Sequence, residues 1–207
     1  MRRQRYAFIL VGLFGVGSAF AADDAADGWK RIFDGKTLNG WKASERPEGW
    51  TVEDGVLVGR GTRTHLFYVA EKFDNFEFQA DILTQPKTNS GIYFHSRYQE
   101  GGWPRYGHEV QVNVTHGDPV KTGSIYNVVK VYETPAKDGE WWTQTIRVTG
   151  QNVVIKINDK VVVDYTEPLG ITGPRRIEKG LFALQQHDPG SVVRYRNIRV
   201  RHLPASD

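Results

Sequence analysis

The chain has 207 residues, of which 39% are hydrophobic and 12% aromatic, enough for one sizeable core but too few for two ordinary domains. It has no cysteine, which excludes disulfides, thiol catalysis and Cys–zinc sites. The formal net charge is +3, and much of that charge lies at the N-terminus.

Residues 1–21 have the pattern of a secretory signal peptide: three arginines precede an apolar run that ends in Ala19-Phe20-Ala21. The run is too short and too rich in glycine for a transmembrane helix, so we expect no membrane insertion after cleavage. Cleavage would remove Arg2, Arg3 and Arg5 and lower the net charge from +3 to 0. No basic stripe then remains to indicate a nucleic acid partner. An exported chain without disulfides suits the periplasm or cell surface of a bacterium.

After an acidic, alanine-rich linker at residues 22–28, residues 29–204 are predicted to form a single all-β domain. Short runs of alternating or β-branched residues, separated by polar and glycine-rich turns, are typical of an antiparallel sandwich or jelly roll. Long loops are expected at residues 98–107, 115–126 and 131–140, where a β-sandwich usually carries its function. Strands are expected over residues 50–57 (a hairpin), 65–69, 76–83, 90–97, 108–114, 142–149, 153–157, 161–165, 180–186 and 192–200.

Four of these strands alternate apolar and polar residues, and a period of two places the two groups on opposite faces of a sheet. The predicted core-facing residues are Ile92, Phe94, Val110, Val112, Phe182, Leu184, Val193 and Tyr195. If the four strands are neighbours in one sheet, the opposite face carries His95, Arg97, Glu109, Gln111, Gln185, His187 and Arg196.

That polar set contains two His, two Arg, two Gln and one Glu, with little Lys, which is more typical of a recognition surface than of a solvated face. Arg and Gln offer the planar, multiple donors that suit sugar hydroxyls. The alternative is a purely structural role, in which the Gln residues extend a cross-strand polar ladder and Glu109 serves only as an ion-pair partner. Trp103, in the first long loop, could be a sugar-stacking platform or a loop anchor.

Four motifs in order resemble one bacterial family. They are Phe33-Asp34-Gly35-Lys36-Thr37-Leu38-Asn39-Gly40-Trp41, Asn89-Ser90-Gly91-Ile92-Tyr93-Phe94, Thr122-Gly123-Ser124-Ile125-Tyr126, and residues 180–187 leading into Arg196-Asn197-Ile198. The family is the 3-keto-disaccharide hydrolases, also described as 3-keto-glucoside lyase/hydratases. The resemblance covers essentially all of residues 29–204. It implies a concanavalin A-like jelly roll of two antiparallel sheets and a carbohydrate substrate. It also implies pairing with a sugar 3-oxidoreductase that supplies the keto-sugar.

A 3-keto-glycoside can be cleaved with a single base, whereas ordinary glycoside hydrolysis needs two carboxylic acids. The ketone acidifies the proton at C2, and its removal lets the C1 substituent leave before water adds. The hypothesis is that Glu109 or His187 is the base and that Arg97 and Arg196 stabilise the oxyanion. His95 or Tyr126 would then assist the leaving group.

In the same hypothesis Gln111 and Gln185 bind hydroxyls, while Tyr126 and Trp103 complete the substrate site. No cofactor is definite, although His95, Glu109 and His187 could hold a divalent metal. Two other classes of protein stay open: a non-catalytic carbohydrate-binding (lectin-like) module that uses the same face, and a structural or adhesion domain that needs no ligand.

Overall fold

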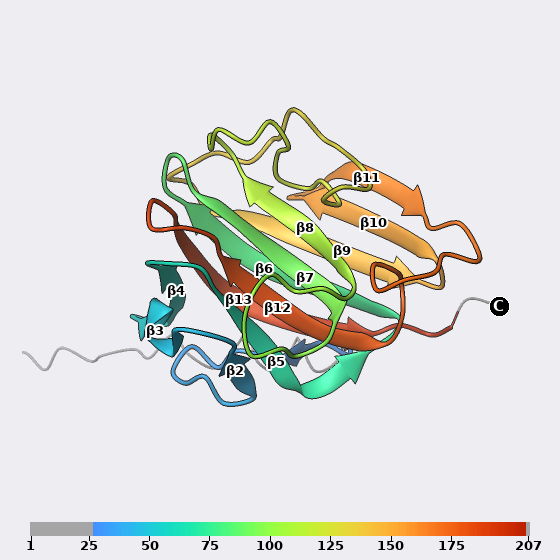
Figure 1. The fold of residues 1–207 in the computed structure, drawn as a ribbon, viewed down its shortest axis with the longest axis horizontal. Helices are drawn as coiled ribbons and strands as arrows, with labels where there is room; N and C mark the ends of the chain where they lie inside the picture. Colours follow the sequence, from blue (N-terminus) through green and yellow to red (C-terminus); the bar gives the residue numbers. More distant parts are fainter. Residues whose placement is uncertain (1–26, 206–207) are drawn as a thin grey trace, which may run out of the picture.

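A computed structural model describes residues 27–205, which fold into two antiparallel β-sheets packed face to face (Figure 1). This arrangement confirms the predicted jelly-roll sandwich. The predicted signal peptide at residues 1–21 and nearly all of the linker at residues 22–28 lie outside the described residues. Within residues 27–205 no helix is long and apolar enough to cross a membrane.

Within residues 27–205 the larger sheet has eight strands. Seven follow one another in a row, and the eighth, β1, pairs with β13. Its order is β11 (Lys160–Thr166), β10 (Asn152–Ile157), β9 (Trp142–Thr149), β6 (Phe76–Thr84), β13 (Val192–His202), β4 (Val56–Arg60) and β3 (Trp50–Glu53), with β1 at Lys30–Arg31. The smaller sheet has five strands. Its order is β2 (Trp41–Ala43), β5 (Thr64–Phe73), β12 (Gly180–Gln186), β7 (Asn89–Ser96) and β8 (His108–Asn113). A short 3₁₀ turn, η1 (Pro47–Gly49), precedes β3.

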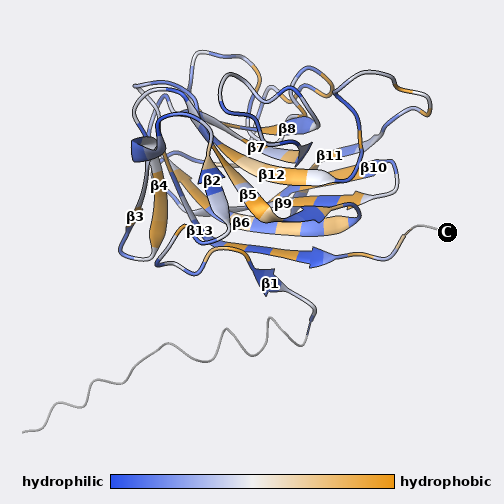
Figure 2. Cartoon of the chain, turned by 60° about the horizontal axis from the view of Figure 1, so that its bottom comes forward, coloured by the Kyte–Doolittle hydropathy of each residue, from blue (hydrophilic) through white to orange (hydrophobic). Residues whose placement is uncertain are grey.

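The apolar side chains that alternate along the strands meet between the two sheets. Figure 2 shows the orange and blue bands that this alternation produces along β6 and β9. The ring of Phe182, from the smaller sheet, lies 4.8 Å from the rings of Phe76 and Phe78 in the larger one. All eight residues predicted to face the core are buried, which confirms the alternation argument for the apolar face. Burial of this area is the main force that holds the sheets together.

Each predicted strand is present, with ends shifted by a few residues; β5 is longer than expected and runs to Phe73. The two short strands β1 and β2 were not predicted, because two or three residues are too few to show a period. The sheet that carries most of the predicted polar face is the smaller one, since β7, β8 and β12 are neighbours in it.

A β-bulge interrupts β7 after Phe94. Tyr93 pairs with Ala183 and Ser96 pairs with Leu181, so β7 contains one residue more than β12 between these two pairs. His95 has a positive φ of 55°, as the extra residue of a bulge often does. The bulge reverses the alternation of β7, so His95 turns away from the face that Tyr93 occupies.

The bulge is packed against a glycine on the neighbouring strand. A Cβ added at Gly180 would lie 2.6 Å from the Cα of His95, closer than real Cβ contacts come. Gly180 does not need a positive φ, so only this close approach selects glycine there.

Gly180→Ala is therefore expected to destabilise the fold by about 1–3 kcal/mol, as overpacking of a close-packed interior does. The measurement is urea unfolding followed by fluorescence. Gly117→Ala is the matched control, because a Cβ there meets no atom within 4 Å and the backbone φ is not positive. Equal stability of the two variants would contradict the close packing of the bulge.

Candidate active site

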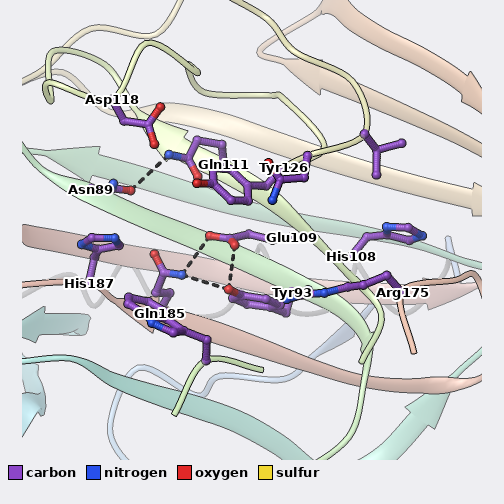
Figure 3. Close-up of a pocket in the computed structure, with 13 residues that line it drawn as sticks. Asn89, Tyr93, His108, Glu109, Gln111, Asp118, Tyr126, Arg175, Gln185 and His187 are labelled. Atoms are coloured by element: carbon purple, nitrogen blue, oxygen red, sulfur yellow. Dashed lines mark hydrogen bonds between the residues drawn. The ribbon is translucent and has the colours of Figure 1, made fainter. Parts of the chain in front are cut away.

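The outer face of the smaller sheet carries polar and aromatic side chains in rows that follow the strand pairing. One row holds His65 on β5 and Gln185 on β12, which are directly paired. The next row holds Tyr93 on β7 and Glu109 on β8, which are also directly paired. Loops close over this face and leave a pocket of about 580 Å³, within the range of small-molecule sites. Figure 3 shows Glu109 pointing into its centre. The pocket is lined by Asn89, Tyr93, Trp103, His108, Glu109, Gln111, Asp118, Tyr126, Asn127, Val128, Arg175, Gln185 and His187.

Glu109 is the most deeply placed carboxylate of the pocket, with 7% of its surface exposed. The Tyr93 hydroxyl donates to its Oε2 at 2.6 Å, and the Gln185 amide donates to its Oε1 at 2.8 Å (Figure 3). The carboxylate leans across Gly91, where an added Cβ would come within 2.9 Å of Glu109 Cγ and Cδ. A glycine on the neighbouring strand thus makes the space that this side chain occupies.

Burial raises the pKa of Glu109 to about 7, and the hydrogen bonds from Tyr93 and Gln185 oppose that rise. The Arg175 guanidinium, which also faces the pocket, opposes it as well. A carboxylate with a pKa near neutrality can both accept and return a proton at physiological pH, as a general base must.

His187 follows the end of β12, two residues after Gln185. Asp188 fixes the orientation of its ring. Its Nδ1 lies 2.8 Å from Asp188 Oδ2, and the Asp188 carboxylate also accepts from the Ser191 hydroxyl and the Gly190 amide. A hydrogen bond from Nδ1–H to Asp188 leaves Nε2 to exchange a proton with a bound molecule. This His–Asp pair therefore suits acid–base chemistry.

Arg175 brings a positive charge to the end of the pocket opposite His187 (Figure 3). Its guanidinium donates to the carbonyl oxygens of Pro104 and Gly107, at 2.7 Å and 3.4 Å. The loop that carries Arg175 is held by Glu167, which accepts from the Ile177 amide at 2.8 Å. The same buried carboxylate pairs with Nε2 of His108 at 2.8 Å, so it joins this loop to the start of β8.

The rim of the pocket is aromatic and polar. Trp103 and Tyr126 are 42% and 38% exposed and offer flat apolar surface, as sugar-binding sites do. Gln111 donates to Asn89 Oδ1 at 3.2 Å. Asp118 stands on the loop after β8, beside Gln111 in Figure 3, and brings a second carboxylate to the pocket.

Of the nine residues predicted for the site, six line this pocket: Glu109, Gln111, Gln185, His187, Tyr126 and Trp103. The prediction that His95, Arg97 and Arg196 share their face is wrong. His95 is fully buried: its Nε2 lies 2.9 Å from the Asp74 carbonyl oxygen, and its Nδ1 accepts from the Glu178 amide. The bulge of β7 is the cause.

Arg97 follows the same bulge and points outward, where it pairs with Glu178 at 2.5 Å and lies over the Tyr106 ring. Arg196 belongs to β13 and therefore to the larger sheet, where it pairs with Asp81 at 3.4 Å and stacks on Trp141. Neither guanidinium lines the pocket.

Sequence reasoning did not select Tyr93, Asn89, Asp118, His108 or Arg175. Tyr93 had a signal, because alternation places it opposite Phe94 on the polar face. Asp118 and Arg175 lie in loops, where no period indicates direction.

The predicted metal set of His95, Glu109 and His187 is not assembled, because His95 lies on the far side of the bulge. Among residues 27–205 no group of three or more His, Cys, Asp or Glu side chains is arranged to hold a metal ion.

The two antiparallel sheets, with a polar pocket on the outer face of the smaller one, define a jelly-roll protein with a pocket of the size that small molecules occupy. Residues 28–201 match the family described as the 3-keto-alpha-glucoside-1,2-lyase-like domain, and the chain belongs to this family.

A curated relative, the 3-keto-disaccharide hydrolase of Bacteroides thetaiotaomicron, is 29% identical over 236 residues, covering 86% of this chain and 79% of the relative. A solved structure from Parabacteroides distasonis, assigned as a glycosyl hydrolase, has a TM-score of 0.76 and 25% identity, covering 88% of this chain and 97% of that one. The carbohydrate-binding module CBM66 of Bacillus subtilis shares the fold with a TM-score of 0.57 and 16% identity, over 78% of this chain and 95% of the module.

Because burial raises the pKa of Glu109 above its ordinary value of 4.5 to about 7, its charged form is disfavoured in the folded protein. Its contribution to stability is complete below pH 4.5 and is lost as the pH rises through 7. Relative to the wild type, Glu109→Gln should thus gain about 2–3 kcal/mol of unfolding free energy between pH 5 and pH 8. Denaturant unfolding at a series of pH values measures this gain, and parallel curves for the two proteins would contradict the raised pKa.

Proposed function

We propose that this protein cleaves the glycosidic bond of 3-keto-glycosides, with Glu109 as the base that removes the proton at C2. The observation that carries this proposal is the single buried carboxylate at the centre of the pocket, with a pKa near neutrality. The family of the chain and the name of its curated relative from Bacteroides thetaiotaomicron support a glycoside-cleaving enzyme.

In the first step the Glu109 carboxylate takes the C2 proton and becomes a carboxylic acid. The C2–H electrons form a C2=C3 double bond, and negative charge moves onto the C3 oxygen. The Arg175 guanidinium and the Tyr93 hydroxyl are the donors placed to stabilise that oxygen. The single Tyr93 proton is donated to the Glu109 carboxylate in the free protein, and it becomes available to the C3 oxygen once Glu109 has taken the C2 proton.

In the second step the C3 carbonyl re-forms, a C1=C2 double bond appears, and the C1–O bond breaks. The leaving oxygen takes a proton from His187, which Asp188 holds in orientation. Water then adds across C1=C2, with its hydroxyl on C1 and a proton on C2, so the net reaction is hydrolysis. Gln111, Gln185 and Tyr126 are available to bind hydroxyls, and Trp103 to stack on a sugar ring.

The substrate needs a ketone at C3, so an enzyme that oxidises the C3 hydroxyl of a glycoside must act before this one. The proposal therefore places the protein after a sugar 3-oxidoreductase, and the predicted signal peptide would put the reaction outside the cytoplasm.

The test is an assay of purified protein with a glucoside and with its 3-keto derivative. We expect cleavage of the keto form alone, a loss of 10²–10⁴-fold in kcat for Glu109→Gln, and slower cleavage of substrate deuterated at C2. Binding of both sugars without cleavage of either would contradict the proposal and indicate a non-catalytic carbohydrate-binding module.

Asp118 raises a second candidate, ordinary hydrolysis by two carboxylic acids, because it brings another carboxylate to the pocket of Glu109. Its Oδ1 already accepts from the Val120 amide at 2.8 Å, and it lies on a loop rather than on the floor. Elimination needs no second carboxylate.

We therefore expect Asp118→Asn to lower kcat on the 3-keto substrate by less than about tenfold, whereas loss of a true acid or base costs 10²–10⁴-fold. The comparison is made with Glu109→Gln under the same conditions. A loss as large as that of Glu109→Gln, together with cleavage of the unoxidised glucoside, would favour the two-carboxylate mechanism.

A further inference from the structure

A group of polar atoms without partners lies just beyond the pocket. His65 is fully buried, and within residues 27–205 neither of its ring nitrogens has a hydrogen-bond partner. Gln185 Oε1 is buried and without a partner as well. The two residues are paired directly across β5 and β12, so three unsatisfied polar atoms share one spot. Buried polar atoms are nearly always paired, so such a cluster calls for an explanation.

One side chain covers this spot. The Trp103 ring lies edge-on to His65, with ring centroids 5.6 Å apart, and is 5.0 Å from the ring of His187. Trp103 lines the pocket while His65 does not, so the indole forms the wall between them. The Arg63 guanidinium lies over the indole, 5.0 Å from the ring centroid.

The loop that carries Trp103 is held in one conformation by hydrogen bonds from a single side chain. The Gln99 side chain donates to the carbonyl oxygens of Gly101 and Trp103 and accepts from the Arg105 amide. Figure 1 shows this connection between β7 and β8 curling in front of the smaller sheet. Arg175, a residue of the pocket, donates to the Pro104 carbonyl of the same loop. A molecule that engages Arg175 therefore competes with a bond that holds the loop down.

We infer that His65 and Gln185 Oε1 form a second sugar subsite beneath Trp103, which takes the hydroxyls of the leaving sugar when the indole is displaced. This inference rests on the proposed function, because it assigns a place to the second ring of a 3-keto-disaccharide. Gln185 joins the two places: its amide nitrogen donates to Glu109 Oε1 at 2.8 Å, and the residue pairs with His65 across β12 and β5. The subsite therefore borders the position of the reacting ring, where the second ring of a disaccharide would lie.

The chemistry of the subsite matches sugar hydroxyls. Burial lowers the pKa of His65 to about 3, so the ring is neutral and offers one N–H donor and one nitrogen acceptor. Gln185 Oε1 adds an acceptor. A pair of neighbouring hydroxyls can donate to both acceptors and accept from the N–H, which satisfies all three atoms. The His187 ring lies 5.0 Å from the Trp103 ring that covers the subsite, so the proton that His187 gives to the leaving oxygen is delivered at the edge of the subsite.

The experiment compares a 3-keto-disaccharide with methyl 3-keto-glucoside, which lacks the second ring. In His65→Phe we expect the ratio of the two kcat/KM values, disaccharide over methyl glycoside, to fall at least tenfold. His65→Gln, which keeps a donor and an acceptor, should retain most of the ratio. Gln144→Leu is the matched control: its two amide atoms are also buried without partners within residues 27–205, but on β9, away from the pocket.

Both His65→Phe and Gln144→Leu should raise the melting temperature by about 2–4 °C, because each removes unsatisfied buried groups. Only His65→Phe should change the ratio. An unchanged ratio in folded His65→Phe would overturn the subsite, while failure of the wild type to cleave either substrate would overturn the proposed function instead.

A second measurement does not depend on a stable His65 variant. In Glu109→Gln, which binds without turnover, the disaccharide should shift the tryptophan emission and the methyl glycoside should not. The shift should vanish in Glu109→Gln/Trp103→Phe. Equal shifts with the two sugars, or a shift that survives the loss of Trp103, would contradict displacement of the indole.

Discussion

The burial of one carboxylate, that of Glu109, is the constraint on which the rest of the pocket depends. A charged group in an apolar interior is costly unless donors surround it. Tyr93 supplies a donor from the neighbouring strand β7 and Gln185 one from β12 beyond it, and Gly91 leaves the space in which the three side chains meet. The remaining cost appears as the raised pKa. A sheet that is anchored by a large apolar core on its other face can hold such a group without unfolding.

The sheet and the loops contribute different things to the site. Strands fix the floor, because register and period two leave little freedom to Glu109, Gln185 and Tyr93. The loops add the charge and the cover: Arg175 comes from one, Trp103 from another. They are joined by side chain to backbone bonds rather than by packing, as where Arg175 donates to Pro104. Contacts of this kind can exchange for contacts with a ligand at small cost, which a solid apolar interface does not allow.

The sequence predicts the site residues on the strands far better than those on the loops. Alternation along β8 and β12 placed Glu109, Gln111, Gln185 and His187 together correctly. It failed at His95 because one extra residue in β7 reverses the faces, and nothing in the local sequence Phe94-His95 indicates a bulge. The residue that accommodates the bulge is Gly180, 85 positions away in the chain. It failed at Arg196 because a strand's period does not reveal to which sheet the strand belongs.

The loop residues of the pocket were beyond such reasoning altogether. Arg175 lies in a loop that is held at its start by Glu167, which is buried against His108 and accepts from the Ile177 amide. That contact joins residues 59 positions apart and has no periodic signature. The same holds for Asp118, whose loop is shaped by hydrogen bonds among its own backbone and side chains. The direction of a side chain could be predicted only within the strands, because only a regular backbone relates the position of a residue in the sequence to the face on which its side chain lies.

The energetics of the pocket also bear on the choice between an enzyme and a binding module that shares this fold. A module needs donors, acceptors and flat rings, and it gains nothing by burying a carboxylate whose charge the site then disfavours. A base that must take a proton from carbon gains from the same burial, since desolvation brings its pKa toward that of a weak carbon acid. The polar atoms left unpaired at His65 follow the same logic, because stability is given up where a ligand restores it. Both features cost the free protein stability, and the proposed function would give each of them a use.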